Sequence, residues 1–469
     1  MSQEISSSPQ PMRLFSDSSN FAEQKKLNKD IFLLAMPVFV GQGINSLTGF
    51  ISRVIIAELG DKAFNAINIG SMVFGLIITV VAAVAVGTTA LVAQNWGLGN
   101  KKRAGEILQQ SLIYGFVISL LIVIIGLPIR GFLFSLLGTD SETTAMGSEF
   151  MFWLLVGIPF LTPGFFLASG LRGAGDTKTP MYAGLVVALF TLLFSYGLIL
   201  GRLGMPRLEV KGAALAVVIA FAAFTLVLAV VMAFKRTVLL LPSKGWRPDL
   251  RTGLSIMKIG LPSATEWILI QLGILIYVSV VAYYGEKALA GFFAGLLILN
   301  LTHAITMGFQ TATTTIVGQA IGAKDYGRAE TALRVSVYLG FTFLGAMAIL
   351  FLLVMTPGVF SALFKELDPE SIYYARRYLV LLAMMMPLMG ISFSVAGGLR
   401  GAGDTINPLI ASAVGVYGGR ILFALAVYHI FHPPVYVIWC SMFPDLVIRL
   451  FIMAIRLKSG KWKTIKVNL

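Results

Sequence analysis

Apolar runs of about 20 residues follow one another along almost the whole chain, from Ile31 to Ile455, with short polar breaks between them. Each run is long enough to cross a hydrocarbon layer of about 30 Å. Because lipid offers the backbone no hydrogen-bond partner, such runs must be helices or barrel strands, and barrel strands would be about half as long and alternate in polarity. The sequence therefore predicts an all-α membrane protein.

The polar breaks divide the apolar sequence into twelve predicted transmembrane helices. Their ranges are 31–57, 64–95, 104–136, 147–171, 179–202, 211–234, 253–283, 288–320, 328–362, 371–398, 407–430 and 434–456. An even number puts both termini on one side. That side carries about 22 Lys and Arg, against about 9 opposite, so the positive-inside rule predicts a multi-pass protein of the cell inner membrane with both termini cytoplasmic.

Composition and motifs exclude several other classes. The net charge of +14 does not indicate nucleic acid, because the basic residues lie in short loops and in the 456–466 tail, where anionic lipid headgroups explain them. The lone Cys440 and three histidines fit neither a disulfide nor a metal-ligand spacing. We expect no enzyme, metal or other cofactor and no nucleic-acid partner; the expected partners are the bilayer and a small organic substrate, and the expected state is a monomer.

An internal repeat defines the organisation. The segment ASGLRGAGDTKTP at 168–180 recurs as AGGLRGAGDTINP at 396–408, and TTALVAQNWGLGNKKRA at 88–104 aligns with TTTIVGQAIGAKDYGRA at 313–329. Each half contains six spans, so both halves have the same orientation in the membrane. The expected fold is two pseudo-symmetric six-helix lobes with a cleft for alternating access between them.

The predicted boundaries follow from this repeat. They are a disordered cytoplasmic tail at 1–28, an N-lobe at 29–234, a cytoplasmic linker at 235–252, a C-lobe at 253–458 and a basic cytoplasmic tail at 459–469. No Walker-type phosphate loop occurs, so an ion gradient is the expected energy source.

The repeated LRGAGDT, the Gln94/Gly97 and Gln319/Gly322 pairs, and the closing pattern from Arg449 to RLKSGKW resemble the multidrug and toxic compound extrusion (MATE) family over nearly the whole chain. That resemblance implies the twelve-helix, two-lobe fold and export of amphiphilic, often cationic compounds against an inward flow of protons or sodium. Relatives often have acidic residues near Ser52 and Ser195, as part of an N-lobe ion site. This sequence has no acid there, which moves the expected ion site to the C-lobe.

The LRGAGDT turn lacks the Lys-Ser/Thr of a phosphate loop. Its glycines allow a tight turn, while Arg172 with Asp176 and Arg400 with Asp404 are spaced either to cap helix ends or to close a cytoplasmic gate by ion pairing. We favour the structural turn.

Ionisable residues inside a membrane are costly and are therefore candidates for function. Asp445 and Arg449, four positions apart, are expected to neutralise each other, with Arg420 as a third member. Glu266 has no basic residue three or four positions away in its span, so we predict that it binds the coupling ion, H⁺ or Na⁺. The alternative is a protonated hydrogen bond that supports the kink at Pro262.

Polar and pliable residues at helical spacing give the candidate substrate contacts. In the C-lobe these are Tyr277, Asn300, His303 and Met389, with ordinary packing as the alternative. In the first span they are Gln42, Asn45 and Arg53, and Arg53 is either a charge that reads an anionic substrate or a snorkelling side chain.

The sequence thus favours an ion-coupled antiporter for amphiphilic, cationic drugs. The alternatives are a flippase for a lipid-linked precursor, which should have a strongly cationic cavity, and an exporter of an anionic metabolite.

Overall fold

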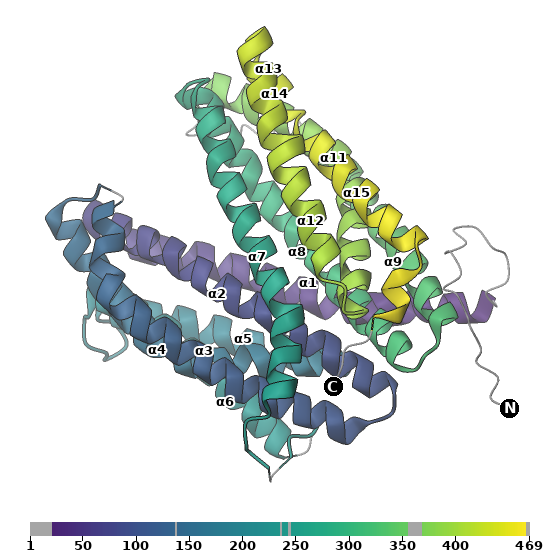
Figure 1. The fold of residues 1–469 in the computed structure, drawn as a ribbon. Helices are drawn as coiled ribbons and strands as arrows, with labels where there is room; N and C mark the ends of the chain where they lie inside the picture. Colours follow the sequence, from purple (N-terminus) through teal and green to yellow (C-terminus); the bar gives the residue numbers. More distant parts are fainter. Residues whose placement is uncertain (1–20, 137, 235–236, 243–244, 355–367, 466–469) are drawn as a thin grey trace, which may run out of the picture. The chain divides into compact units, whose positions relative to one another are not determined.

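The structure is a computed structural model of the 469-residue chain and describes residues 21–136, 138–234, 237–242, 245–354 and 368–465. All regular elements in these ranges are helical (Figure 1). The first half contains α1 (Phe21–Ala57), α2 (Asp61–Gly97), α3 (Lys101–Leu136), α4 (Ser141–Gly173), α5 (Lys178–Phe194), the π-helix η1 (Ser195–Ile199) and α6 (Glu209–Ala233). The second half contains α7 (Leu250–Ala282), α8 (Glu286–Gly322), α9 (Tyr326–Val354), α11 (Pro369–Gly401), α12 (Ile406–Ala413), the π-helix η2 (Val414–Leu422), α13 (Phe423–Phe431), α14 (Val435–Trp439), α15 (Met442–Lys458) and the 3-10 helix η3 (Lys461–Thr464).

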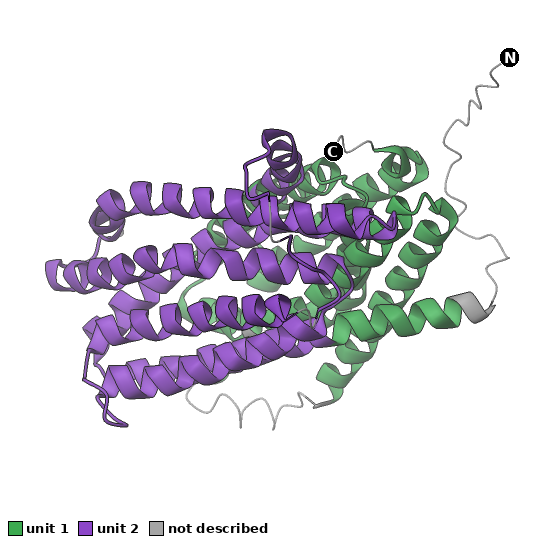
Figure 2. Ribbon diagram, turned by 90° about the horizontal axis from the view of Figure 1, so that it is seen from below, with its two compact units in different colours: residues 1–36, 265–468 green, residues 37–264, 469 purple. Residues whose placement is uncertain are grey.

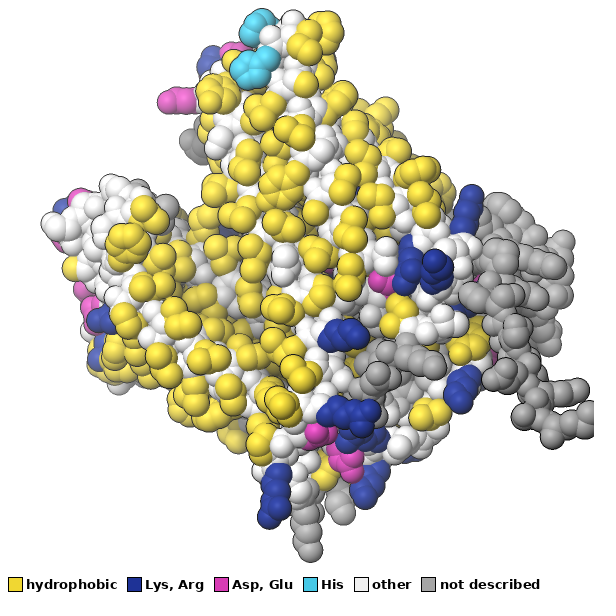
Figure 3. Space-filling view, viewed as in Figure 1, with side chains coloured by type: hydrophobic (Ala, Val, Ile, Leu, Met, Phe, Trp, Pro, Cys, Tyr) yellow, Lys and Arg dark blue, Asp and Glu magenta, His cyan; other side chains and the backbone are white. Residues whose placement is uncertain are grey.

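Twelve helical segments in the described residues are long and apolar enough to cross a membrane, which confirms the predicted number of spans. The eleventh is α12, η2 and α13 in succession, and the twelfth is α14 with α15. Hydrophobic side chains cover most of the helix surface visible in Figure 3, and Lys and Arg side chains gather near helix ends. An apolar surface on the outside of helices is what a hydrocarbon solvent requires.

Several boundaries differ from those predicted. The first helix begins at Phe21, within the segment predicted as a disordered tail, and α7 begins at Leu250, within the predicted linker. The predicted ninth span ran to 362, but 355–367 lies outside the described residues. The basic tail is ordered as far as 465: Trp462 in η3 is fully buried and Lys463 forms an ion pair with Glu330 of α9. Burial of one tryptophan therefore packs the start of the predicted basic tail against the rest of the protein.

The chain divides into two compact units (Figure 2). Unit 1 comprises residues 1–36 and 265–468, and unit 2 comprises residues 37–264 with 469. The division falls inside α1 and α7, next to Pro37 and Pro262 at matching positions of the repeat. Each of these two helices therefore contributes residues to both units, whereas the predicted lobes were divided at the linker.

The repeat is visible at atomic level in both units. In unit 2, Thr89 Oγ1 donates to Ser169 O at 3.0 Å, and in unit 1, Thr314 Oγ1 donates to Gly397 O at 2.9 Å. A Cβ on Gly401 would lie 2.4 Å from the Thr314 carbonyl oxygen, so only glycine permits this approach of α8 and α11. Small residues and Thr hydroxyls are typical of close helix contacts in membranes.

The cores of the two units differ in chemistry. Unit 2 has an aliphatic and phenylalanine core between α2, α3, α4 and α6, with Phe134 and Phe150 at its centre. Unit 1 has an aromatic cluster in which Phe292, Tyr378 and Trp439 pack with ring centroids 5.1 to 6.5 Å apart. Tyr378 brings a hydroxyl group into this core, and a buried hydroxyl needs a partner.

Candidate functional site: a buried charge cluster in unit 1

Glu266 lies one helical turn after Pro262 in α7, and only 4% of the residue is exposed. Arg400 Nη2, at the end of α11, donates to its Oε2 at 2.6 Å, and Ser412 Oγ, in α12, donates to its Oε1 at 2.7 Å. Hydrogen bonds to a buried carboxylate are stronger than neutral ones. Glu266 is therefore a buried acid whose charge is compensated, at the point in unit 1 where α7, α11 and α12 meet.

A second acid lies close by on α15. Asp445 is fully buried, and its carboxylate accepts from Arg420 Nη2 at 2.6 Å and from Arg449 Nε at 2.5 Å. The expected neutralisation of Asp445 by these two arginines is confirmed. A Cβ on Gly415 of the π-helix would lie 2.5 Å from Asp445 Oδ1, so a glycine is required where η2 meets α15.

One hydroxyl connects the two acids. Ser412 Oγ, which donates to Glu266, accepts from Arg449 Nη1 at 3.4 Å. The connected charge cluster contains the three guanidinium groups of Arg400, Arg420 and Arg449 and the two carboxylates of Glu266 and Asp445, so it has one surplus positive charge. Nε and Nη1 of Arg400 and Nε of Arg420 have no hydrogen-bond partner among the described residues. Removing either acid would leave a buried guanidinium without compensation, which is costly.

A small cavity of about 30 Å³ borders the charge cluster. A space of this size holds about two waters or one small ion, and not a drug. Gln310 Oε1, in α8, is buried beside it without a partner among the described residues. The cavity is lined by Glu266, Trp267, Ile270, Gln310, Ser392, Phe393, Ala396, Arg400, Pro408, Ser412, Arg449 and Met453.

None of the predicted substrate contacts of the C-lobe is among the residues that line this cavity. His303 is half-buried between the rings of Trp267 and Phe393, at centroid distances of 5.4 and 5.1 Å. Tyr277 is buried and donates to Ile438 O at 3.1 Å; Met389 is buried and Asn300 is exposed. The structure thus brings His303 alone of these four close to the cavity wall.

The first-span candidates belong to unit 2. Gln42 is half-buried, and Asn45 and Arg53 are exposed along the same helix, α1. No interaction between these residues is present within the described part of unit 2, and their role stays a prediction.

The two LRGAGDT copies form the same turn, but the arginine of each copy has different surroundings. Gly175 and Gly403 have φ of +93° and +89°, which glycine adopts without strain. Asp176 accepts from the backbone N–H and the hydroxyl of Thr179 in the first turn of α5, at 2.9 and 2.7 Å. Arg172 is half-buried at the end of α4.

In the second copy, Asp404 accepts from the backbone N–H of Asn407 at 3.3 Å and pairs with Arg456 Nε at 2.5 Å. Arg400 is buried and pairs with Glu266 rather than with Asp404. The ion pair between Arg400 and Asp404 that a cytoplasmic gate would use is therefore not formed in this structure, and Asp404 instead accepts from the start of α12.

The sequence analysis did not connect Arg400 or Ser412 with Glu266, because Arg400 was considered only as part of the LRGAGDT turn. Glu266 seemed to have no cation because only its own helix was considered, while its partner Arg400 lies 134 positions away. The available signal was that LRGAGDT places an arginine at the end of a long apolar helix, where a counter-charge has to come from elsewhere. Ser412 carries no such signal, since serines are common in membrane helices.

Comparison with known proteins agrees with this architecture. The MatE family model matches residues 37–197 and again 262–426, so each half of the repeat matches it separately. The chain belongs to the MatE family and is a multi-pass membrane transporter.

Curated relatives are similar over nearly their full length. A probable multidrug resistance protein NorM of Thermotoga maritima is 24% identical over 94% of both chains. A probable multidrug resistance protein YoeA of Bacillus subtilis is 24% identical over 87% of this chain and 89% of its own. An FAD transporter of Shewanella oneidensis is 24% identical over 78% of this chain and 81% of its own.

Solved structures show the same fold. A MOP superfamily transporter from Pyrococcus furiosus, described as having a binding pocket of reverse polarity, superimposes with a TM-score of 0.85 at 22% identity, over 95% of this chain and all of its own. The Vibrio cholerae MATE transporter VcmN superimposes with a TM-score of 0.86 at 17% identity, over 95% of this chain and 99% of its own.

Proposed function

We propose that this protein is an ion-coupled antiporter that exports amphiphilic, cationic organic compounds by alternating access, with Glu266 as the site of the coupling ion. The proposal includes an inner-membrane location with both termini cytoplasmic. The observation that carries it is a buried carboxylate beside a cavity of ion size, in a family of transporters. Ionisable residues inside a membrane commonly mark the path of a transported or coupling ion.

The charge cluster suggests how coupling would proceed. A proton or Na⁺ arriving at Glu266 competes with Arg400 for the carboxylate and leaves that guanidinium without compensation. The resulting unfavourable charge would drive unit 1 toward an arrangement in which Arg400 finds another partner. Sodium would additionally use the oxygens of Ser412 and Gln310, whereas a proton needs no further ligand.

The test is ethidium efflux from energised cells, with the proton and sodium gradients collapsed separately. Glu266→Gln should abolish efflux. Efflux by the wild type should be lost when one of the two gradients is collapsed and kept when the other is, which identifies the coupling ion. Glu286→Gln removes an exposed acid of the same unit and should leave efflux unchanged. Full efflux by a well-expressed Glu266→Gln variant would refute the coupling role.

Because Glu266→Gln leaves Arg400 uncompensated, the variant could fail through misfolding. The double variant Glu266→Gln with Arg400→Gln removes both charges and should fold, since neutral replacements for a buried pair are tolerated. Its expected efflux is still zero, because the acid is absent. Restored efflux would show that Glu266 serves only to neutralise Arg400.

A second candidate function is export of an organic anion. The surplus positive charge of the cluster and the similarity to an FAD transporter favour it. No ethidium efflux in any condition, together with release of flavin nucleotides by vesicles that contain the wild type, would put this function first. A lipid-linked anion moved by a flippase would instead appear as scrambling of a labelled headgroup.

A further inference from the structure

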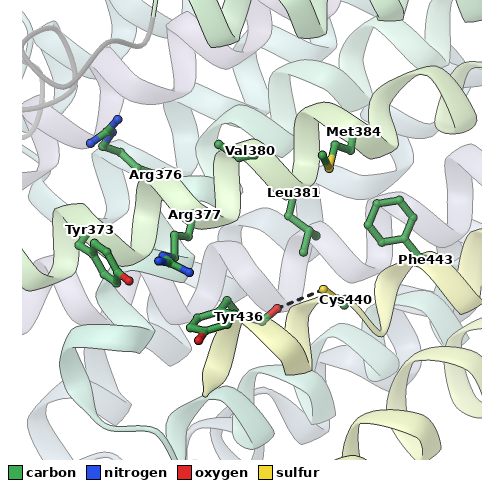
Figure 4. Close-up of a pocket in the computed structure, with 9 residues that line it drawn as sticks. All are labelled: Tyr373, Arg376, Arg377, Val380, Leu381, Met384, Tyr436, Cys440 and Phe443. Carbon is green, nitrogen blue, oxygen red and sulfur yellow. Dashed lines mark hydrogen bonds between the residues drawn. The ribbon is translucent and has the colours of Figure 1, made fainter. Parts of the chain in front are cut away.

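A groove outside the charge cluster runs along the surface of unit 1 between α11 and the α14–α15 segment (Figure 4). Its volume is about 520 Å³, and it is open to one side of the helices. Most of its wall is apolar, and several of these side chains are exposed: Val380 by 46% and Met384 by 64%. The groove is lined by Tyr373, Arg376, Arg377, Val380, Leu381, Met384, Tyr436, Cys440 and Phe443.

Two exposed arginines lie at one end of this groove. The Arg377 guanidinium is held between two tyrosine rings, 4.7 Å from the Tyr373 centroid and 4.6 Å from the Tyr436 centroid. The Arg376 side chain points away from Arg377 (Figure 4). Neither arginine forms an ion pair with any acid in the described residues. The groove thus has a fixed cationic end and an apolar remainder.

The length of the groove matches one leaflet. From Tyr373 to Met384 the helix rises by about 16 Å at about 1.5 Å per residue. Half of a hydrocarbon layer of about 30 Å is about 15 Å. Tyr373 lies one turn after the start of α11, so the arginines lie near the helix end, where headgroups are expected, and Met384 lies near mid-membrane.

We propose that this groove binds one anionic glycerophospholipid of the leaflet that meets the start of α11. Its phosphate and anionic headgroup contact Arg376 and Arg377, and an acyl chain lies along Val380, Met384 and Phe443. Tyrosine at the interface and arginine on phosphate are the usual pairings in membranes. A cationic or uncharged amphiphile would leave both arginines without a counter-charge, and a zwitterionic phospholipid offers one phosphate whose charge its own ammonium group offsets.

Cys440 allows the groove to be probed without engineering, because it is the single cysteine of the chain, is exposed and lines the groove. A bimane label on Cys440 is read in nanodiscs of phosphatidylcholine that contain a small fraction of brominated phosphatidylglycerol or brominated phosphatidylcholine. The anionic lipid should quench at a much lower mole fraction. Each arginine near a headgroup contributes on the order of a five-fold preference, so the pair should give about 25-fold.

The variant Arg376→Gln with Arg377→Gln should quench equally with both lipids, and Arg376→Gln alone should lose about five-fold. The matched control Arg202→Gln with Arg207→Gln removes two exposed arginines from unit 2 and should keep the full preference. The single variant Arg376→Gln is the control for misfolding, because among the described residues Arg376 makes no ring contact like that of Arg377.

The label itself fills part of the groove, so native mass spectrometry of the unlabelled protein provides an independent count of bound lipid. One phosphatidylglycerol should remain bound to the wild type and be lost from Met384→Trp, which fills the apolar end while keeping both arginines. Equal quenching by the two lipids in the wild type, or an anionic preference that survives loss of both arginines, would overturn the proposal.

Discussion

The two units descend from one repeat, yet among the described residues a buried charge cluster is present in unit 1 alone. The positions that correspond to Glu266 and Ser412 in unit 2 are Gly41 and Gly184, and a Cβ at either glycine would meet nothing within 4 Å. The arginine of LRGAGDT is present in both copies. In unit 2, α6 has no charged residue after Lys211, while the matching α15 carries Asp445 and Arg449.

This difference shows that a repeat can keep its turns and helix contacts while one copy acquires a polar interior. The contacts common to both units are backbone approaches at small residues, which any pair of membrane helices can make. The charges of unit 1 depend on each other, since each buried guanidinium needs an acid. Substitutions in the cluster should therefore have larger effects than substitutions at the matching positions of unit 2.

The largest effect is expected for Asp445→Asn. It leaves Arg420 and Arg449 without a carboxylate inside unit 1, so the free energy of unfolding should fall by at least about 3–5 kcal/mol. Thermal unfolding of the detergent-solubilised protein measures this change. Glu286→Gln, at an exposed acid of the same unit, should unfold like the wild type. An unchanged unfolding temperature for Asp445→Asn would mean that the buried charges do not make unit 1 more sensitive to substitution than unit 2.

A smaller effect is expected for Ser412→Ala, which removes the hydroxyl that joins Glu266 to Arg449. The lost hydrogen bonds to charged groups should lower the free energy of unfolding by about 1.5–3 kcal/mol. The matched substitution in unit 2, Gly184→Ser, enters open space and should change it by less than about 0.5 kcal/mol. Equal effects at both positions would contradict the comparison.

The smallest effect concerns an acid of unit 2 outside the membrane helices. Hydrogen bonds from the Thr252 hydroxyl and the Arg251 backbone N–H lower the pKa of Asp249, just before α7. A lowered pKa in the folded state stabilises the protein above the ordinary pKa of about 4, and this stabilisation disappears as the pH falls through the folded value. Because the side chain is 44% exposed, Asp249→Asn should cost only about 0.5 kcal/mol at pH 7.

The measurement for Asp249 is the difference in unfolding temperature between Asp249→Asn and the wild type as the pH is lowered. The difference should shrink as the pH falls below about 4, through the lowered pKa of the folded state. A difference that stays constant between pH 7 and pH 3 would assign the effect to packing rather than to charge.

Much of the fold could be predicted from the sequence. Hydrophobic length gives the twelve spans, and the repeat gives two halves, because lipid restricts the backbone to helices and identical turns impose identical contacts. The structure of the chain ends was harder to predict. Burial of Trp462 orders the C-terminal segment, and a single tryptophan in a basic tail does not reveal where it packs. Likewise, π-helical turns such as η2 leave no clear pattern in hydropathy.

The candidate site was predicted only in part. Glu266 and the Asp445 cluster stand out because charges are rare in membrane helices. The contact between Glu266 and Arg400 depends on how α7 meets α11, and no periodicity along a single helix contains that information. The packing of His303 between two rings depends on tertiary structure in the same way.

The division of the chain inside α1 and α7 also bears on how the protein is synthesised. Unit 2, apart from residue 469, has been translated once the ribosome has passed Ala264, whereas residues 1–36 belong to a unit whose other members begin only at Thr265. Phe32, for instance, packs against Phe343, which is translated more than three hundred codons later. The first helix must therefore be inserted long before half of it has a folded environment, and the nascent chain depends on the insertion machinery or on lipid to shield that half until the last helices arrive.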